Sequence, residues 1–369
     1  MASVMIVGAY APSLLNFRGP LIREMCQRGH AVIAVAPRFD EKTRGALVGM
    51  GATCEEIYLD RTGISPLRDL RTLVSIFRAI YRVRPDALLL YTIKPVIYGS
   101  IVAQLLRVRR VYSMITGLGY VFVGSPGTSM LRRMVVFLYR RALRGNSAVF
   151  FQNPDDMGLF EAERLVPRQA RKVLINGSGV DLSHFRPCAL PDESVFLLIA
   201  RLLIDKGIRE YVAAARLVRR SHPNAQFLLV GWLDGNPGSL SREEIDGYER
   251  EGLISYLGPS DDVRKVIPLC RIYVLPSYRE GTPRTVLEAM AMGRPIITTD
   301  APGCRETVRH GFNGLQVPVK DAAALASAMV KMLDERMETN RMADNSLALV
   351  REKYDCNLVN TSILSTMGL

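Results

Sequence analysis

The chain has 369 residues, a length that exceeds one ordinary hydrophobic core and favours two domains. Its mean hydropathy of +0.10 and the lack of any apolar run of about 18 residues exclude a polytopic membrane protein. The six cysteines are scattered, without a C-x-x-C pair or a histidine at ligand spacing, which predicts a reduced cytosolic protein with no metal cluster.

The net charge of +12 is concentrated in the first half of the chain. Residues 1–190 hold 26 basic and 13 acidic side chains, a net charge of +13, whereas the remainder holds 22 and 23, a net charge of −1. This asymmetry predicts an acidic partner for the first half: a membrane surface, a nucleic acid or an anionic substrate.

Strands and helices alternate along the first half. The expected strands are Val4–Val7, His30–Ala36, Ala87–Tyr91 and Val111–Ile115, and the expected helices are Pro20–Arg28 and Pro66–Val83. Repeated strand–helix units indicate a parallel doubly wound sheet, in which ligands bind at the carboxyl ends of the strands.

Two glycine-bearing loops are expected at that edge. Gly8 follows the first strand and opens a loop through Asn16 to Gly19, where a missing Cβ lets backbone approach a ligand. Thr116-Gly117-Leu118-Gly119 follows a later strand, and an ordinary turn is the alternative there. The spacing does not fit the dinucleotide fingerprint G-x-G-x-x-G.

The same alternation restarts after residue 190. The expected strands are 195–201, 226–231, 255–257, 272–275 and 295–299, with a helix at Gly207–Arg220. Glycines and prolines between Ile175 and Glu193 predict a linker. We therefore expect two similar doubly wound domains with a cleft between them.

Two carboxylates, Glu280 and Glu288, lie eight residues apart across an expected loop-to-helix junction. Thr282 and Pro283 are typical of a helix cap followed by the first helical residue. A helix N-terminus favours phosphate, so carboxylates at both ends suit a ligand with a central diphosphate and terminal hydroxyls, such as a nucleotide sugar. The alternative is coincidental spacing, but an unpaired acid in the apolar helix around Glu288 would be costly to bury.

A basic pair is expected at the same edge of the same sheet. Arg201 ends a strand, and Lys206 precedes the helix that Gly207 opens. Such a pair could neutralise charge on a departing nucleoside diphosphate. The alternative is a solvated loop with a lysine at a helix start.

Two helices of the first half are basic and amphipathic. Helix 129–144 places Arg132, Arg133, Arg140, Arg141 and Arg144 within about half its circumference, and helix 68–82 clusters Arg68, Arg71, Arg78 and Arg82. Helices of this kind often lie on anionic bilayers, which favours a membrane surface over core-facing helices with solvated arginines.

These residues together resemble the retaining nucleotide-sugar glycosyltransferases of family 4, which have the GT-B fold. The segments that carry the resemblance are NGSGVDLSHFRP, LIARLLIDKGI, EGTPRTVLE and GRPIITTDAPGCRETVRHGFNGLQVP. The resemblance covers essentially the full length and is strongest from Ile175 to Leu333. It implies an α/β chain of two Rossmann-like doubly wound domains with an interdomain cleft.

The expected division has three parts. Residues 1–185 would form an acceptor- and membrane-facing domain, and residues 186–350 a nucleotide-sugar-binding domain. A C-terminal helix within 351–369 would pack back on the first domain.

The resemblance also implies roles for single residues. Arg201 and Lys206 would contact the donor diphosphate and assist leaving-group departure. Glu280, counted with them as catalytic, would bind hydroxyls of the donor sugar, and Glu288 the nucleotide ribose. Further donor contacts are expected at Gly8, Gly258, Gly281, Thr282, Arg284, Thr285 and Val286.

The acceptor side is expected to include Asn16, Thr116, Gly117 and Gly119. Many relatives carry a histidine in the loop that here contains Thr116, and a glycine where this chain has Pro283. The missing N–H of Pro283 would shift the phosphate cradle by one residue.

Among subgroups, the chain is most similar to bacterial enzymes that add a sugar, often N-acetylgalactosamine, to an undecaprenyl-diphosphate-linked saccharide. The implied function is retaining, metal-independent transfer of a hexose or N-acetylhexosamine from a nucleoside-diphosphate donor, expected to be UDP-linked, in bacterial polysaccharide or glycan assembly. The enzyme would be cytoplasmic, peripheral on the inner face of the cytoplasmic membrane, without a cofactor or a nucleic-acid partner.

Two alternatives stay open. One is an epimerase or hydrolase that acts on nucleotide sugars with the same fold. The other is a non-catalytic protein whose basic half binds nucleic acid, which the scarcity of aromatic residues among the basic ones disfavours.

Overall fold

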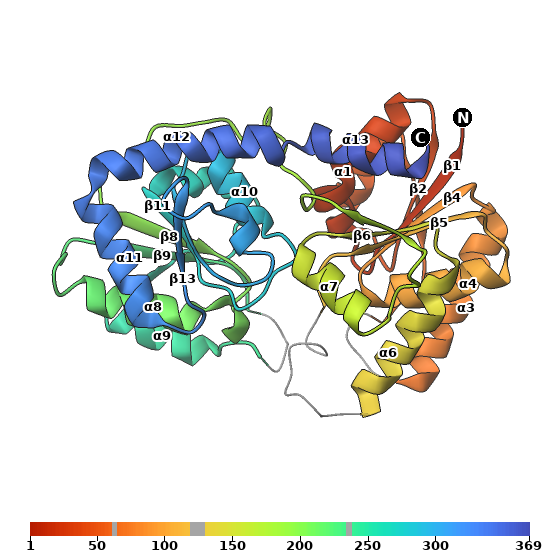
Figure 1. Cartoon of the computed structure of the whole chain (residues 1–369), viewed down its shortest axis with the longest axis horizontal. Helices are drawn as coiled ribbons and strands as arrows, with labels where there is room; N and C mark the ends of the chain where they lie inside the picture. Colours follow the sequence, from red (N-terminus) through yellow and green to blue (C-terminus); the bar gives the residue numbers. More distant parts are fainter. Residues whose placement is uncertain (61–64, 119–129, 234–237) are drawn as a thin grey trace. The chain divides into compact units, whose positions relative to one another are not determined.

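The computed structural model describes residues 1–60, 65–118, 130–233 and 238–369. The chain divides into two compact units, Met1–Ser178 with Cys356–Leu369, and Gly179–Asp355 (Figure 1). The chain therefore leaves the first unit after Ser178 and re-enters it at Cys356.

The first unit is built on a seven-stranded sheet of parallel neighbours in the order β3-β2-β1-β4-β5-β6-β7. The strands are β1 (Ser3–Val7), β2 (Ala31–Ala36), β3 (Thr53–Glu56), β4 (Ala87–Tyr91), β5 (Arg110–Ile115), β6 (Ala148–Phe151) and β7 (Arg171–Leu174). The strand order reverses between β1 and β4, the point at which open α/β sheets bind ligands beyond the carboxyl ends of the strands.

Helices cover both faces of this sheet, as Figure 1 shows for α1 and α13 on one side and α3, α4 and α6 on the other. The first layer contains α1 (Ala11–Gln27), α2 (Glu41–Gly49) and α13 (Cys356–Met367). The second contains α3 (Pro66–Val83), the π-helix η1 (Pro95–Gly99), α4 (Ser100–Leu105), α6 (Met130–Ala142), the 3-10 turn η2 (Leu143–Gly145) and α7 (Pro154–Ala162). The helix expected at Pro66–Val83 is confirmed with its bounds.

The segment expected as a loop from Gly8 to Gly19 is helical instead, because α1 already begins at Ala11. Pro12 stands in the first turn, where a residue without an N–H costs nothing. Buried Leu14, Leu21 and Met25 continue one face of the helix through Pro20. The free energy gained by burying these side chains exceeds the cost of the hydrogen bond that Pro20 cannot make. The prediction of a loop was therefore wrong.

Helix α13 packs against the first unit. Val359, Ile363 and Met367 recur every four residues and are buried in the core that α1 shares. The hydroxyl of Tyr112 on β5 donates a hydrogen bond to the Met367 carbonyl at 3.1 Å. The first unit is therefore assembled from two segments that are distant in sequence.

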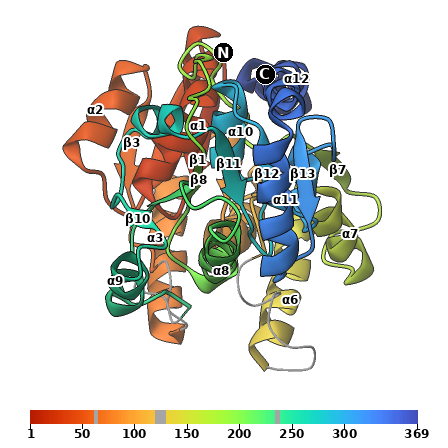
Figure 2. The ribbon, with the colours of Figure 1, turned by 90° about the vertical axis from the view of Figure 1, so that its left-hand side faces the viewer.

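The second unit repeats this topology with six parallel strands in the order β10-β9-β8-β11-β12-β13. The strands are β8 (Val195–Ile199), β9 (Gln226–Val230), β10 (Ser255–Tyr256), β11 (Ile272–Leu275), β12 (Ile296–Thr299) and β13 (Gly314–Val317). Figure 2 turns this unit toward the viewer, with β8, β11, β12 and β13 side by side.

Alternating side chains of β8 enter two cores. Phe196 and Leu198 pack with α8 (Ile208–Val218), α9 (Arg242–Arg250) and α11 (Ala322–Asp334), whereas Leu197 and Ile199 pack with α10 (Arg284–Ala291) and α12 (Arg336–Lys353). A parallel strand that is buried on both faces has a continuous run of apolar residues in its sequence. The sequence of β8, VFLLI, is such a run. The doubly wound parallel organisation expected from the sequence is confirmed in both units.

Candidate functional site

The candidate site lies at the switch point of the second sheet, between β8 and β11. The loop after β8 carries Arg201 and ends in the 3-10 turn η3 (Ile204–Lys206), and the loop after β11 runs to Pro283. The two loops are joined by a hydrogen bond from the Tyr278 N–H to the Asp205 carbonyl, at 2.8 Å.

Gly207 allows this close approach. Its φ of +71° lies in the left-handed region, and a Cβ on it would be 2.1 Å from the Pro276 carbonyl oxygen. The positive φ and the nearby carbonyl oxygen each disfavour any residue with a Cβ at this position, unless the local backbone shifts. Gly207 therefore lets η3 pack on the loop after β11 and directs Lys206 toward Glu280.

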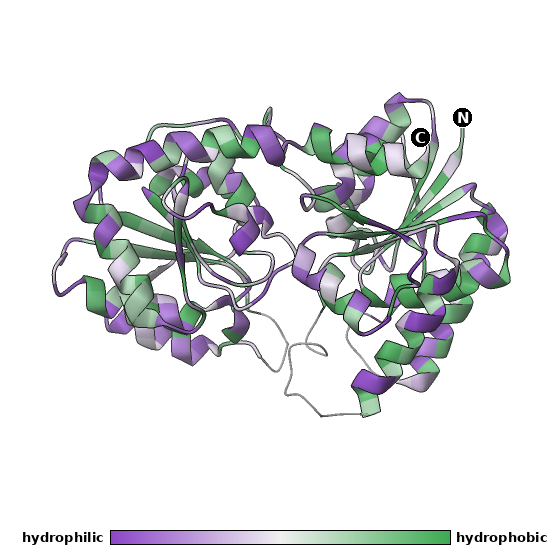
Figure 3. Cartoon of the chain, in the orientation of Figure 1, coloured by the Kyte–Doolittle hydropathy of each residue, from purple (hydrophilic) through white to green (hydrophobic). Residues whose placement is uncertain are grey.

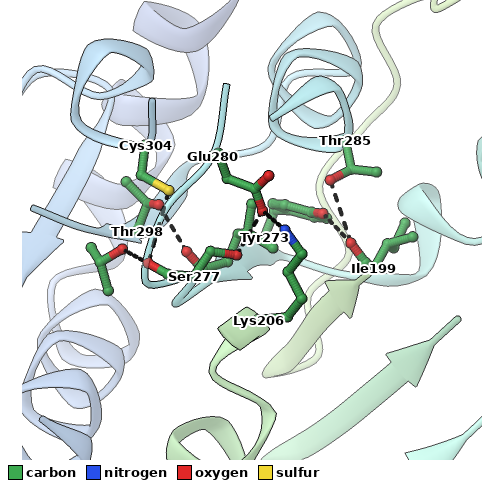
Figure 4. Close-up of polar contacts among 10 residues, drawn as sticks. Ile199, Lys206, Tyr273, Ser277, Glu280, Thr285, Thr298 and Cys304 are labelled. Atoms are coloured by element: carbon green, nitrogen blue, oxygen red, sulfur yellow. Dashed lines mark hydrogen bonds and ion pairs between the residues drawn. The ribbon is translucent and has the colours of Figure 1, made fainter. Parts of the chain in front are cut away.

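Lys206 and Glu280 form an ion pair, with Nζ 2.5 Å from Oε1 (Figure 4). Their side chains are only 11% and 19% exposed. The hydroxyl of Ser277, which is fully buried, donates to the same Oε1 at 2.9 Å. The structure thus brings together the basic loop and the acidic loop that the sequence singled out, and adds Ser277.

The backbone around Glu280 is held by the loop after β12. The Glu280 N–H donates to the Pro302 carbonyl at 2.9 Å. A Cβ on Gly303 would lie 2.2 Å from the Glu280 carbonyl oxygen and 2.4 Å from that of Gly281, and Gly303 has a φ of +80°. The buried hydroxyl of Thr299 donates to the Ser277 carbonyl. Ser277 and Gly303 were missed by sequence reasoning, because their contacts lie between distant segments.

Cys304 lies beneath this cluster. Its sulfur is 4.0 Å from the Ser277 carbonyl oxygen, and burial, reinforced by the negative charge of Glu280, raises the pKa of its thiol to about 12. Cys304 therefore stays a neutral, buried thiol beside Ser277 (Figure 4).

We expect Gly303→Ala to destabilise the protein by about 1–3 kcal/mol, because the new Cβ strains the backbone and displaces the Glu280 carbonyl. Urea unfolding measures this loss of stability. The matched control is Gly311→Ala, since Gly311 also has a positive φ, +75°, but open space around its Cβ position. Equal losses in both variants would contradict the role assigned to the contact.

Helix α10 begins one residue later than expected. Pro283 is its N-cap and makes no side-chain cap bond, so the prediction that Thr282 caps the helix was wrong. The Pro283 carbonyl accepts the N–H of Val286 at 3.2 Å, and Val286 stays a predicted donor contact. The N–H groups that open the helix are those of Arg284 and Thr285.

Thr285 and Tyr273 attach α10 and β11 to the end of β8. The hydroxyl of Tyr273 donates to the Ile199 carbonyl at 3.2 Å, and that of Thr285 reaches the same oxygen at 3.4 Å (Figure 4). The first turn of α10 is thereby fixed beside the loop that carries Arg201.

Glu288 is buried on α10, with 7% of its side chain exposed, and is paired with Arg284 one turn earlier at 2.7 Å. Burial raises the pKa of Glu288, Arg284 opposes the rise, and the negative charge of Asp262 adds to it. From the sequence we expected that Glu288 would have no charged partner unless a ligand was bound. In the structure Arg284 is that partner.

The raised pKa of Glu288 predicts that the free energy of unfolding depends on pH. Because the folded-state pKa of Glu288 exceeds the unfolded value of about 4.3, its carboxyl is protonated in both states below that pH and does not change the stability. As the pH rises from the unfolded pKa to the raised folded-state pKa, the free energy of unfolding falls, and above the raised pKa the loss is constant. The free energy of unfolding of the native chain should therefore fall with rising pH relative to that of Glu288→Gln. Urea unfolding across this range tests it, with the exposed Glu335→Gln as control; a difference independent of pH would contradict the expectation.

The remaining donor candidates lie at the same edge of the second sheet. Arg201 lies two residues beyond the end of β8 at Ile199 and is half-buried, and Gly281 is buried next to Glu280. Gly258 follows β10, has a φ of +75° and leaves open space at its Cβ position. Its carbonyl accepts the N–H of Gly231 at the end of β9.

The first unit holds the other predicted residues. Gly8 directly follows β1 at the switch point, and a Cβ there would lie 2.2 Å from the Tyr91 hydroxyl oxygen. Thr116 and Gly117 follow β5 at the same edge, Asn16 is exposed on α1, and Gly119 lies outside the described residues.

A charged pair that sequence reasoning missed also lies at the switch point of the first sheet. Lys94, which follows β4, forms an ion pair with Asp69 on α3 at 2.7 Å. Both side chains are largely buried, with 15% and 19% exposed. The pair ties the first turns of α3 to the carboxyl edge of the sheet.

Residues 1–60, 65–118, 130–233 and 238–369 contain neither a candidate metal site nor a candidate membrane-spanning helix. No cluster of three or more histidine, cysteine and acidic side chains there could hold a metal ion. No helix there combines the length and the apolar character that crossing a bilayer requires.

Both units match families of sugar-transferring enzymes. Residues 193–335 match the family described as glycosyl transferases group 1, and residues 18–177 match the glycosyl transferase 4-like domain. The first match lies within Gly179–Asp355 and the second within Met1–Ser178, so each falls in one structural unit.

Two relatives act on lipid-linked saccharides according to their names. N,N'-diacetylbacillosaminyl-diphospho-undecaprenol alpha-1,3-N-acetylgalactosaminyltransferase of Campylobacter jejuni is 27% identical over 363 residues, covering 94% of this chain and 93% of the relative. UDP-Gal:alpha-D-GlcNAc-diphosphoundecaprenol alpha-1,3-galactosyltransferase of Escherichia coli is 24% identical over 304 residues, covering 76% and 75%.

Solved structures share the fold over the whole chain. Sucrose-phosphate synthase of Thermosynechococcus elongatus has a TM-score of 0.81 at 19% identity, covering 99% of this chain and 98% of its own. HepE of Anabaena in complex with UDP-glucose has a TM-score of 0.79 at 19% identity, covering all of both chains. The two parallel sheets, the switch-point loops and these matches show that the chain belongs to the group 1 glycosyltransferases of family 4 and has the GT-B fold.

Proposed function

We propose that the protein transfers a sugar, with retention of configuration and without a metal ion, from a UDP-sugar to a polyprenyl-diphosphate-linked saccharide. N-acetylhexosamine is the expected sugar, and bacterial surface polysaccharide or glycan assembly is the expected process. The observation that carries the proposal is the ion pair of Lys206 and Glu280 at the switch point of the second sheet, beside the N-terminus of α10.

The relatives support the choice of donor and acceptor. The names of two of them specify a saccharide linked to undecaprenol through a diphosphate, and one names UDP-galactose as donor. The UDP-glucose complex of HepE adds a structural relative that holds a UDP-sugar. The sugar itself is assigned by analogy with the Campylobacter relative alone.

Lys206 and Arg201 would bind the donor diphosphate, together with the first N–H groups of α10. In the reaction, the bond between the sugar's anomeric carbon and the diphosphate oxygen breaks, and UDP leaves with the electron pair. The acceptor oxygen bonds to the same face of the sugar, and its proton passes to the departing phosphate. Positive charge from Lys206 and Arg201 stabilises this departure, as fixed cations do in phosphate transfer sites.

The glutamates would position the donor. Glu280 would accept hydrogen bonds from sugar hydroxyls, with Ser277 and Lys206 holding its carboxylate in place. Glu288 would bind the nucleotide ribose, which requires part of its buried carboxylate to turn from Arg284. Gly258, Gly281, Thr282 and Gly8 stay proposed donor contacts, and Asn16, Thr116, Gly117 and Gly119 proposed acceptor contacts.

The first unit, with its excess of positive charge, would take the acceptor at the inner face of the cytoplasmic membrane. A polyprenyl-diphosphate acceptor is both membrane-embedded and doubly anionic, so it accounts for the basic half of the chain.

The deciding experiment is a panel of UDP- and GDP-sugars assayed against undecaprenyl-diphosphate-linked acceptors. We expect one UDP-sugar to be transferred in the presence of EDTA, with an α-linkage from an α-donor determined by NMR. Turnover of the donor to completion without acceptor would instead indicate a hydrolase or epimerase. Inversion at the anomeric carbon would contradict the proposed mechanism.

A further inference from the structure

Three unusual features of the first unit lie together after β4, at the carboxyl edge of its sheet. They are a residue with a strained backbone, Thr92, the π-helix η1, and a polar cluster of Asp69, Lys94 and Tyr98, here called the Asp69 cluster. Hydrophobic residues predominate along the strands of this sheet (Figure 3). The polar groups at its edge therefore do not belong to the core and need another explanation.

Thr92 has two unfavourable features. Its φ of +69° lies in the left-handed region, where a β-branched residue is an outlier. Its hydroxyl oxygen is buried and has no hydrogen-bond partner among the residues that the structure describes. Residues held in this way cluster at binding and catalytic sites, where the surrounding structure keeps them in place at a cost in stability. Thr92 therefore indicates that the chain after β4 is shaped for binding.

The π-helix η1 gives a second, independent indication. It spans Pro95–Gly99, and its N-cap is Lys94. A single π-helical turn is rare in proteins and frequently lies at a functional site. Here Lys94 lies at the start of the turn and Tyr98 about one turn later, and η1 packs on α3. Both side chains thereby reach Asp69 in the first turn of α3.

Asp69 is the centre of the cluster. Its carboxylate accepts a hydrogen bond from the Lys94 ammonium group at 2.7 Å and another from the hydroxyl of Tyr98. Burial raises the pKa of Tyr98, and the negative charge of Asp69 raises it further, so Tyr98 stays a neutral donor. A carboxylate can accept about four hydrogen bonds, so Asp69 can also accept from hydroxyl groups of a ligand.

The composition of the cluster suits a sugar better than a phosphate. A carboxylate, an ammonium group and a phenol together have no net charge, whereas they offer the acceptor and donor groups that hydroxyl groups need. The second unit has a pair of the same type, Lys206 with Glu280, at the switch point of its own sheet. There Arg201 is expected to add positive charge for a diphosphate, and Tyr98 adds none in the first unit.

We propose that Asp69, with Lys94 and Tyr98, binds hydroxyl groups of the sugar that accepts the transfer, and that Thr92 is a positioning residue for this cluster. This inference deepens the proposed function and rests on it for the presence of a saccharide acceptor. Each sheet then holds one sugar at its switch point, the donor sugar in the second unit and the acceptor sugar in the first. The cluster does not contact the diphosphate or the lipid of the acceptor.

Thr92→Gly separates this role from a purely structural one, in which the cluster only fastens α3 to η1. Glycine adopts a φ of +69° without strain, so the midpoint of urea unfolding should be unchanged or higher. The KM for the acceptor should nevertheless rise about threefold, because the freer backbone no longer fixes the cluster. A lower midpoint, or an unchanged acceptor KM, would contradict the positioning role.

Steady-state kinetics test the contact with a water-soluble acceptor, N-acetylglucosamine linked through diphosphate to a short prenyl chain. We expect Asp69→Asn to raise the KM for this acceptor by at least about tenfold, and Tyr98→Phe by about threefold to tenfold, with the KM for the UDP-sugar unchanged. The matched control is Asp86→Asn, since Asp86 accepts the Ser3 N–H at 2.8 Å at the opposite edge of the same sheet. It should leave both KM values unchanged.

A prenyl diphosphate of the same chain length, without the sugar, distinguishes sugar binding from diphosphate binding. It should inhibit the native chain and Asp69→Asn equally. Weaker inhibition of Asp69→Asn would assign the cluster to the diphosphate and overturn the proposal. An acceptor KM that neither Asp69→Asn nor Tyr98→Phe changes would also overturn it. Circular dichroism verifies that each variant folds.

Saturation-transfer NMR with the same acceptor, in the absence of a UDP-sugar, separates this inference from the proposed function. Signals from the sugar protons should appear with the native chain and be lost with Asp69→Asn. This result without transfer from any UDP-sugar would retain the cluster and reject the function. Transfer with a native acceptor KM in both Asp69→Asn and Tyr98→Phe would retain the function and reject the cluster.

Discussion

Replacing Lys206 by alanine is expected to lower the rate of sugar transfer by about 10²–10³-fold, the usual loss when one fixed charge-stabilising group is removed from a reaction centre. The Nζ of Lys206 lies 2.5 Å from the Glu280 carboxylate and the side chain is largely buried, so its charge is held at a fixed place in the site. Affinity for UDP should fall as well, because Lys206 is proposed to contact the diphosphate. Steady-state kinetics and calorimetric titration with UDP measure the two losses.

The matched control is Lys331→Ala, which removes an exposed lysine that also faces a glutamate, Glu335, on the same unit. It should leave both rate and UDP affinity unchanged, since exposed ion pairs contribute little. Full activity of Lys206→Ala on the true substrates would remove the main support for the proposed function.

Glu280→Gln is expected to lower the transfer rate by about 10²-fold while leaving the affinity for UDP itself nearly unchanged. The amide keeps the size of the side chain but loses the charge that holds Lys206, and it weakens the bonds to sugar hydroxyls. Because UDP lacks the transferred sugar that Glu280 is proposed to hold, the loss should appear in binding of the UDP-sugar and in the rate. Titrations with UDP and with the UDP-sugar, side by side, measure this split.

Glu251→Gln is the appropriate comparison, since Glu251 is also paired with a cation, Arg216, but is exposed on the surface of the same unit. We expect it to behave as the native chain. A Glu280→Gln variant that loses UDP affinity as strongly as Lys206→Ala would assign Glu280 to the diphosphate rather than to the sugar.

Most of the fold could be predicted because parallel strands buried on both faces leave continuous apolar runs. The runs at Ala87–Tyr91 and Ile272–Leu275 have the bounds expected from the sequence. The start of α1 was missed because Pro12, Asn16, Gly19 and Pro20 are all poor helix formers. The burial of Leu14 and Met25, a tertiary effect that local propensity does not include, decided the structure there.

The main charged residues of the site could be predicted from the sequence, but the residues that hold them in place could not. Lys206 and Glu280 belong to motifs, so their proximity could be anticipated, whereas Ser277 and Gly303 act through contacts that only the fold brings together. The pairing of Arg284 with Glu288 was within reach of the sequence, since residues four apart share a helix face. The capping residue was misplaced because Pro283 can occupy the position before a helix as well as its first turn.

The return of α13 to the first unit has a consequence for the order in which the chain folds during synthesis. Domains usually fold as they leave the ribosome, N-terminal first. Here Val359, Ile363 and Met367 complete the core beside α1, so residues 1–178 emerge without the helix that covers that surface. Residues 179–355 form a contiguous unit and can finish folding before the unit that precedes them. The second unit is therefore in effect an insertion in the first, and the newly made first half has an uncovered apolar face until α13 arrives.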